Sequence, residues 1–370
     1  MERTGYTEPV VDFALDRLFQ SIDRSSIEAT IVGELGSVAA LDGFVARPGR
    51  PDVSFRGASR AVIVASDTTI GVAVPALVFA LCAKAHVTVK DRDDRLVAAF
   101  AQTLVEEEPA LAQRVTVEVW VGRDTAQSRA RLSEADVVVA YGTDAALGAI
   151  RAQLAPHARF VGFGHRTSIG YVAREALCNE TAAMSAARAA ALDALLYDGD
   201  GCLSLHALFV ERGEAIAPPE FASTLARACD QVAVEFPAGA SQAPPAVAAY
   251  RRAALFRAAV GRGALYDGIV APHLVAYDAP VDEPPPLLPR TLAVYPVEGP
   301  QDALAYVRRH ALPLEAFVRV AGTRPDVEAV ALQSGASRIA LLGRLQTPPL
   351  GGEHGGEGRI LPFVRAIYRE

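Results

Sequence analysis

The sequence of 370 residues has few cysteines and a deficit of positive charge. The four cysteines are Cys82, Cys178, Cys202 and Cys229. Their wide spacing, with no CxxC pair, argues against a zinc knuckle or a disulfide framework. We therefore predict reduced thiols, no metal site and a cytoplasmic location. The 36 Lys and Arg against 43 Asp and Glu give a net charge of −7. Because nucleic-acid binding requires a basic face, no nucleic-acid partner is expected.

Long apolar runs are also lacking. The most apolar stretch, residues 70–83, is about 14 residues long, contains Pro75 and is closed by Lys84. A bilayer-spanning helix needs about 20 apolar residues, so this stretch predicts a buried helix and no membrane span. With 51% hydrophobic and 21% charged residues, the composition is that of an ordinary globular protein. The length suits two domains.

Short apolar runs alternate with helical patterns from residue 61 onwards. The predicted strands are 61–65, 86–90, 115–121, 136–140 and 159–163. These runs are continuous rather than alternating, which is typical of strands buried on both faces of a parallel sheet. Right-handed crossovers then make this part a doubly wound domain of the nucleotide-binding type.

A second alternation follows a change of composition after residue 174. An alanine-rich helix leads to Cys202, and the predicted strands are 203–210, 291–297, 314–320 and 337–343. The predicted fold class is therefore α/β with two doubly wound parallel-sheet domains. The predicted division is 1–175 for an N-terminal segment plus the first domain, 176–345 for the second domain with Cys202, and 346–370 for a C-terminal tail.

Cys202 lies in YDGDGCLSLHALF, residues 197–209, between a tight Asp/Gly turn and an apolar strand. Gly201 lets the backbone approach a reacting group closely and leaves the sulfur unshielded, as a nucleophile requires. A small buried core cysteine fits the same residues, because this is the commonest fate of a free cysteine. The other three cysteines lie in apolar helical patterns and are predicted to be core residues.

Polar residues follow three of the predicted strands, at the edge where open parallel sheets bind ligands. These residues are Ser66, Asp67 and Thr68, then Lys90, then Gly142 and Thr143. Gly142 opens GTDAALG, residues 142–148, whose helix start could place backbone N–H groups against a phosphate. Ordinary turns and N-caps use the same residue types, and Lys90 is either a ligand or a solubilising lysine.

Four stretches in one consistent order resemble the aldehyde dehydrogenase superfamily, and within it the fatty acyl-CoA reductases, including the reductase component of bacterial bioluminescence. They occupy residues 65–94, 140–151, 197–211 and 343–356. The resemblance implies a Rossmann-like NAD(P)-binding domain, a catalytic domain with Cys202 as nucleophile, and an active site in the cleft between them. It also implies NADH or NADPH as cofactor, held by Ser66, Lys90, Asp93, Gly142, Thr143 and Gly148. Asp93 would favour NAD, whereas Arg92 and Arg95 could hold a 2′-phosphate.

Two positions depart from the pattern of the family. The asparagine of its oxyanion hole falls on Asp67, where an ionised carboxylate would repel a developing oxyanion. Either Asp67 is protonated in an apolar site, or Thr68 donates in its place, or activity is impaired. The glutamate that activates water in hydrolytic members falls near Ser168, where no acid is present. The acyl-enzyme is therefore expected to be reduced, or exchanged with a thiol, rather than hydrolysed.

These features predict NAD(P)H-dependent reduction of an acyl thioester, carried by coenzyme A or an acyl-carrier protein, to an aldehyde through an acyl-cysteine. A catalytically degenerate binding or scaffold subunit is the alternative, and an NAD(P)-dependent aldehyde dehydrogenase is a weaker one. The resemblance further implies an acyl-activating partner enzyme and a homo-oligomer.

Overall fold

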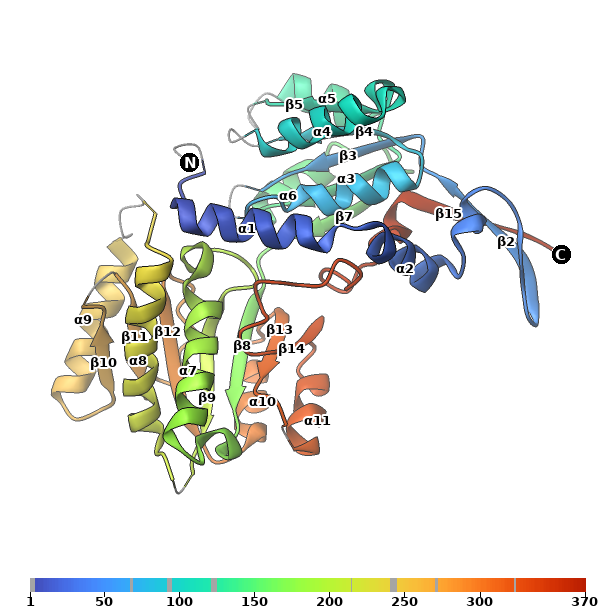
Figure 1. The fold of residues 1–370 in the computed structure, drawn as a ribbon. Helices are drawn as coiled ribbons and strands as arrows, with labels where there is room; N and C mark the ends of the chain where they lie inside the picture. Colours follow the sequence, from blue (N-terminus) through green and yellow to red (C-terminus); the bar gives the residue numbers. More distant parts are fainter. Residues whose placement is uncertain are drawn as a thin grey trace. The chain divides into compact units, whose positions relative to one another are not determined.

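The computed structural model describes residues 4–66, 69–91, 95–120, 125–213, 215–239, 245–269, 272–322 and 324–370. The chain forms two compact units (Figure 1). The five-stranded unit contains residues 14–165 and 349–370, and the seven-stranded unit contains residues 1–13 and 166–348. α1 (Glu8–Ser21) is shared between the units.

The division between the units differs from the predicted one in three ways. Residues 1–13 belong to the seven-stranded unit and not to the first domain. The division falls at residue 165 rather than 175, because β8 (Thr167–Val172) pairs with strands of the seven-stranded sheet. The predicted tail also splits at residue 348. Its later part contributes Leu350, Ile360 and Phe363 to the core of the five-stranded unit. The end of the chain is therefore part of the first domain and not an appendage.

The five-stranded sheet is parallel throughout and has the order β5-β4-β3-β6-β7. Its strands are β3 (Arg60–Val64), β4 (His86–Lys90), β5 (Val115–Glu118), β6 (Val137–Tyr141) and β7 (Arg159–Phe163). The predicted doubly wound sheet is thus confirmed. The chain order reverses between β3 and β6, which is where ligands bind in such sheets.

Helices cover both faces of this sheet. The helices are α3 (Ala73–Cys82), α4 (Leu96–Glu107), α5 (Thr125–Leu132) and α6 (Asp144–Arg151). Ile63 packs with α3 and α4, whereas its neighbours Val62 and Val64 pack with the end of α5 and with α6. Because successive side chains of a strand point to opposite faces, a continuous apolar run is what this burial demands.

The sequence patterns did not indicate the other elements of the five-stranded unit. These are α2 (Arg24–Leu35), β1 (Val45–Arg47), β2 (Arg50–Gly57), β15 (Val364–Arg369) and the short 3₁₀ helices Val38–Leu41, Pro109–Gln113 and Leu361–Phe363. The strands form an antiparallel sheet of order β1-β2-β15. The carboxylate of Glu34 on α2 accepts hydrogen bonds from the backbone N–H groups of Ile360 at 3.0 Å and Leu361 at 2.9 Å, which anchors the returning chain.

The seven-stranded sheet has the order β10-β11-β12-β9-β8-β13-β14. Besides β8, its strands are β9 (Leu205–Glu211), β10 (Ala264–Asp267), β11 (Leu274–Tyr277), β12 (Thr291–Val297), β13 (Leu314–Arg319) and β14 (Arg338–Leu341). Every pairing is parallel except that of the edge strand β10 with β11. The predicted parallel sheet is confirmed, with one antiparallel edge strand added.

Helices lie on both faces of this sheet as well. They are α7 (Glu180–Leu195), α8 (Pro218–Glu235), α9 (Pro245–Ala259), α10 (Pro300–Arg309) and α11 (Pro325–Gln333), with 3₁₀ helices Arg174–Leu177 and Leu196–Gly199. α7 and α8 pack on one face, and α10 and α11 on the other (Figure 1). Asn179 caps α7, since its side chain accepts a hydrogen bond from the N–H of Ala182 at 2.9 Å. α7 then delivers the chain directly to the turn before Cys202.

Candidate active site

The carboxyl edge of the five-stranded sheet brings together four of the predicted cofactor residues. Ser66 follows β3, Lys90 ends β4, and Gly142 and Thr143 follow β6. β3 and β6 flank the point at which the chain order reverses, where open α/β sheets bind their ligands. Asp67, Thr68 and Asp93 lie outside the described residues.

Lys90 is half-buried at this edge and has an aromatic neighbour. Its Nζ lies 5.9 Å from the centre of the Trp120 ring, within range of a cation–π interaction. The indole is itself fixed, because Trp120 Nε1 donates a hydrogen bond to Ser128 Oγ at 3.0 Å. Lys90 is therefore a held cation at the ligand edge. Trp120 was not singled out by sequence, since it lies within the predicted strand 115–121 like any apolar residue, whereas β5 ends at Glu118.

The stretch 142–148 is the start of α6 and not an extended loop. Thr143 is its N-cap, and its Oγ1 accepts a hydrogen bond from the N–H of Ala146 at 3.2 Å. Asp144 occupies the first turn, where it already places a negative charge at the helix start. Gly148 lies inside α6 on an exposed face, and a Cβ there would meet nothing within 4 Å. Gly142 and Thr143 thus lie at the carboxyl edge of the sheet, as predicted for cofactor residues. At position 148 no neighbouring atom is close enough to require a glycine.

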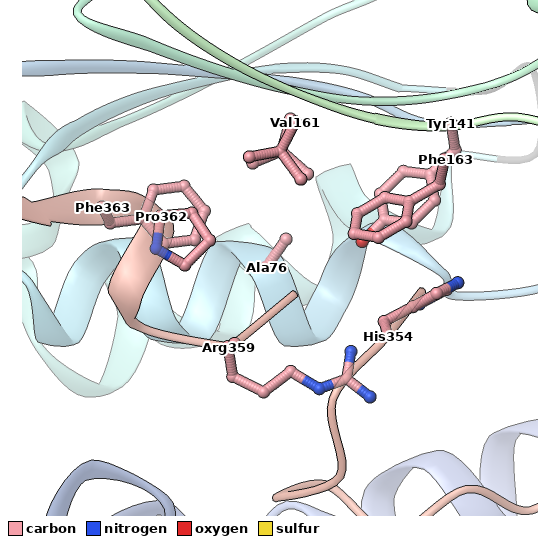
Figure 2. A pocket seen from close by; sticks show the side chains of 10 residues that line it. Ala76, Tyr141, Val161, Phe163, His354, Arg359, Pro362 and Phe363 are labelled. Carbon is pink, nitrogen blue, oxygen red and sulfur yellow. The ribbon is translucent and has the colours of Figure 1, made fainter. Parts of the chain in front are cut away.

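A small pocket lies beside this turn, between β6, β7 and the returning C-terminal segment (Figure 2). The His354 ring centre lies 4.3 Å from that of Phe163 and 5.6 Å from that of Tyr141, and Tyr141 and Phe163 stack at 4.9 Å. Arg359 lines the pocket, and its Nε donates a hydrogen bond to the carbonyl of Gly352 at 2.7 Å. The ring contacts fix the segment around His354 next to Gly142.

In the seven-stranded unit, a constrained turn presents Cys202. Tyr197, Asp198 and Gly199 all have positive φ, at 53°, 54° and 76°. The buried Asp198 carboxylate holds this turn, because it accepts hydrogen bonds from Arg290 Nη1 at 2.9 Å and from the N–H of Gly239 at 3.0 Å. The predicted tight turn before the cysteine is confirmed.

Hydrogen bonds from two sides fix the segment that carries Cys202. Ser168 Oγ, on β8, donates to the Cys202 carbonyl at 2.9 Å. Gln346 Nε2 donates to Ser204 Oγ at 3.3 Å and to the Asp193 carbonyl at 3.1 Å. Ser168, the position where no acid stands, is therefore a direct neighbour of the cysteine and acts as a donor to its backbone.

The buried carboxylate of Asp193 holds the turn that precedes Gln346. It accepts hydrogen bonds from the N–H groups of Gly343 at 2.7 Å and Leu345 at 3.1 Å. Burial raises the pKa of Asp193 to about 7, even though both hydrogen bonds act in the opposite direction. This residue therefore titrates near neutral pH beneath the cysteine segment.

The Cys202 thiol is protonated at neutral pH. Burial raises the pKa of Cys202 to about 12, and the carboxylate of Glu315 adds to the rise. The N–H groups of Cys202 and Leu203 and the guanidinium of Arg166 act in the opposite direction. Since the thiolate is the nucleophile, reaction at this site needs a group that removes the proton.

His206, which follows Cys202 in the sequence and lies on β9, does not serve this purpose, and the other cysteines vary in exposure. His206 is buried on β9, burial lowers its pKa to about 4, and its Nδ1 has no hydrogen-bond partner among the described residues. Cys229 is buried and Cys82 half-buried, but Cys178 is exposed. The prediction of a core position for Cys178 is wrong because this residue ends a short 3₁₀ helix instead of facing the sheet.

Two general findings concern the described part of the chain. It contains no group of three or more His, Cys, Asp and Glu side chains placed to hold a metal ion. None of its helices combines the length and the apolar character that a membrane crossing requires.

The fold is that of the aldehyde dehydrogenases. PutA from Anabaena variabilis matches with a TM-score of 0.66 and 15% identity over 99% of this chain and 83% of its own. Aldehyde dehydrogenase KauB from Pseudomonas aeruginosa matches with a TM-score of 0.66 and 14% identity, over 88% of this chain and 71% of KauB. An NAD-dependent benzaldehyde dehydrogenase from Corynebacterium glutamicum matches with a TM-score of 0.63 and 13% identity, over 99% of this chain and 84% of that enzyme.

The chain belongs to the acyl-CoA reductase (LuxC) family, whose profile matches residues 1–366. The predicted resemblance to the fatty acyl-CoA reductases is thus confirmed. A comparison with the curated proteins gave no match.

Proposed function

We propose that this protein reduces an acyl thioester, carried by coenzyme A or an acyl-carrier protein, to an aldehyde through an acyl-enzyme on Cys202. The observation that carries the proposal is the presentation of Cys202. A constrained turn and the Ser168 hydrogen bond fix its backbone, and the N–H groups of Cys202 and Leu203 interact with its sulfur. Membership of the acyl-CoA reductase (LuxC) family supports the substrate class.

The first half of the reaction is acyl transfer. Cys202 Sγ attacks the thioester carbonyl, the carbon–sulfur bond to the carrier breaks, and the thiol proton ends on the departing carrier thiol. The oxyanion formed on the way needs donors, and the Cys202 N–H is one candidate. In this proposal a second donor comes from the segment that contains Asp67 and Thr68.

The second half needs a hydride donor, which a nicotinamide cofactor supplies when bound. The donor set at the carboxyl edge of the five-stranded sheet fits such a cofactor, because a held ammonium, a hydroxyl and a glycine backbone meet there. Lys90, Ser66, Gly142 and Thr143 would hold it, with Asp93 and Gly148 as further predicted contacts. NADH and NADPH are both retained in the proposal. Collapse of the hemithioacetal oxyanion on Cys202 releases the aldehyde and restores the thiolate.

The test combines turnover with direct detection of the intermediate. The protein is incubated with acyl-CoA of several chain lengths and NADH or NADPH, and aldehyde and cofactor absorbance are followed. Intact mass is measured without cofactor, where we expect one acyl group that Cys202→Ala removes and that the matched control Cys178→Ala retains. No turnover and no acylation at any chain length would overturn the proposal.

A second candidate is a degenerate member that binds ligands without catalysis. The protonated thiol of Cys202 favours it, because burial opposes formation of the nucleophile. It predicts that Cys202→Ala leaves the cellular function intact. Production of free acid from aldehyde without coenzyme A would instead indicate an aldehyde dehydrogenase. An acyl-activating partner enzyme and a homo-oligomer remain predictions.

A further inference from the structure

A buried glutamate lies on the strand next to Ser168. In the pairing of β13 with β8, Leu314 is opposite Thr167 and Ala316 is opposite Ser168. Two steps along β13 thus match one step along β8, and Glu315 is the extra residue. Such bulges redirect a side chain and occur often beside active sites. The sequence LEAFVR therefore carries its acid at a point where the strand departs from regular pairing.

The side chain of Glu315 is buried and forms an ion pair with Arg166. The residue is 3% exposed, and its Oε2 lies 3.7 Å from Arg166 Nε. Arg166 is itself held at the start of β13, where its Nη1 donates to the Leu314 carbonyl at 3.5 Å. A buried carboxylate is costly unless it is paired. The ion pair with Arg166 therefore offsets part of the cost of burying Glu315.

Ser168 links this part of β13 to the cysteine segment. Ser168, the residue of β8 beside the bulge, donates its hydroxyl to the Cys202 carbonyl at 2.9 Å. The fields of Glu315 and Arg166 also act on the Cys202 thiol, in opposite directions. The amino ends of β8, β9 and β13 thus gather a nucleophile, a carboxylate and a guanidinium.

A second bulge, on β9, involves His206, and we do not assign His206 an acid–base role. β9 also has an extra residue opposite Ser168, because Ser168 pairs with Leu205 and Ile169 with Ala207. The extra residue is His206, whose Nδ1 is buried with no hydrogen-bond partner among the described residues and whose pKa burial lowers to about 4. Glu315, and not His206, is among the groups that act on the Cys202 thiol, so Glu315 is the acid–base group that we consider.

We propose that Glu315 is the general base of this site, and that it takes the proton of the Cys202 thiol, directly or through one water molecule, as Sγ attacks the thioester. The proton then passes to the departing carrier thiolate, so that the carboxylate is regenerated and the charge balances. Arg166 positions the carboxylate. This inference rests on the proposed function, since it assigns the proton transfer of its first step.

The experiment separates proton transfer from thiol ionisation. Wild type and Glu315→Gln are mixed with acyl-CoA without cofactor, quenched in acid at set times, and the mass of acylated protein is measured. In parallel, alkylation of Cys202 by iodoacetamide is measured at pH 8. We expect acylation to slow by about 10²- to 10⁴-fold, as for loss of a general base. Alkylation should not slow, because loss of a negative neighbour favours the thiolate.

Glu211→Gln is the matched control. Glu211 ends β9 in the same sheet, is fully buried, and is paired with Arg174 and Arg324, but it stands at the opposite edge from Cys202. It should lower the unfolding temperature without slowing acylation. Glu315→Asp, which keeps the charge on a shorter side chain, should acylate at an intermediate rate and shows whether the fold tolerates the site.

The outcomes distinguish the two proposals. Acylation of Glu315→Gln at the wild-type rate overturns the role of Glu315 and leaves the proposed function standing. Parallel slowing of acylation and alkylation overturns it as well, because that pattern reports a displaced cysteine. If Glu315→Gln is acylated normally but releases free acid more slowly than wild type, Glu315 serves water and the inference is wrong. Absence of acylation in wild type at every chain length overturns both proposals together.

Discussion

The two sheets present their reactive side chains at opposite edges. In the five-stranded sheet, Ser66, Lys90 and Gly142 follow the carboxyl ends of strands, as expected for a doubly wound ligand-binding sheet. In the seven-stranded sheet, Cys202 precedes β9 and Glu315 lies at the start of β13, so the nucleophile belongs to the amino edge. Two sheets of the same fold class thus differ: the candidate cofactor residues lie at the carboxyl edge of one, and the candidate nucleophile lies at the amino edge of the other.

The carboxyl edge of the seven-stranded sheet is occupied by a closed ion cluster instead. Burial alone would raise the pKa of Glu211, but hydrogen bonds from Arg174 and Arg324 hold it below its usual value. The paired groups satisfy one another, with Glu211 Oε1 at 3.0 Å from Arg324 Nη2. This edge therefore has a structural role. The rule that open parallel sheets bind ligands at the carboxyl ends of their strands predicts the candidate cofactor residues, but it does not predict the position of the cysteine.

The largest effect is expected for a substitution of Cys202, which should abolish turnover without affecting cofactor binding. Cys202→Ser should lower turnover by at least about 10⁴-fold, because a serine hydroxyl ionises far less readily than a thiol and is a much weaker nucleophile. Cofactor binding should persist, since its predicted residues belong to the other sheet. Trp120, whose ring lies 5.9 Å from Lys90 Nζ, provides a fluorescence signal for that binding. Loss of both signals in a folded variant would contradict the separation.

The stability of the seven-stranded unit should depend on pH through Asp193. Its pKa rises from an ordinary value of 3.8 to about 7 on folding, chiefly through burial. The folded state therefore binds the proton more tightly, so this contribution to stability is present below about pH 4 and is lost as pH rises towards 7. Between pH 5 and 8 the loss should approach about 3 kcal/mol.

Urea unfolding of Asp193→Asn measures this contribution. At pH 5 both oxygens of the protonated carboxyl can still accept the N–H groups of Gly343 and Leu345, whereas the NH₂ group of the amide cannot accept, so the variant should be less stable at pH 5. Its deficit should shrink or vanish at pH 8. The exposed Asp16→Asn on α1 is the control and should show no such pH dependence. An equal deficit at both pH values would mean that Asp193 does not titrate in this range.

Much of the fold could be predicted because its strands are continuous apolar runs. β4, β7 and β12 have the bounds that their sequences indicate. β8 escaped prediction because TSIGYV begins with polar residues and follows β7 without an intervening helix. β15 escaped because it is largely exposed and pairs with β2, more than 300 residues earlier in the chain, where local patterns carry no information.

The candidate site shows the same contrast between local and long-range information. Cys202 could be found from the Asp/Gly turn beside it, which is encoded within a few residues. Glu315 could not, because LEAFVR resembles any apolar strand with one polar position. Its place beside the cysteine depends on the bulged register between β13 and β8, whose partners lie far apart in the chain.

A smaller effect is expected at the carboxyl edge of the five-stranded sheet. Lys90→Ala should weaken cofactor binding by about 10- to 100-fold, equal to roughly 1.4–2.8 kcal/mol, because it removes the held ammonium. Acylation of Cys202 measured without cofactor should stay at the wild-type rate. Lys84→Ala, on the same unit but exposed at the end of α3, is the control. Equal losses in both variants would show that general charge, and not the ligand edge, governs binding.

The smallest effect tests whether Thr143 has more than a structural role. Thr143→Ala removes the cap of α6, in which Oγ1 accepts the Ala146 N–H at 3.2 Å, and should cost about 1 kcal/mol of stability. Thr143→Ser keeps the hydroxyl and should restore that loss. If Thr143 also contacts the cofactor, Thr143→Ala weakens cofactor binding beyond its effect on stability, and Thr143→Ser recovers both. Unchanged cofactor affinity in a destabilised Thr143→Ala would leave Thr143 as a helix cap and move the ligand contacts of this edge to Lys90 and the backbone of Gly142.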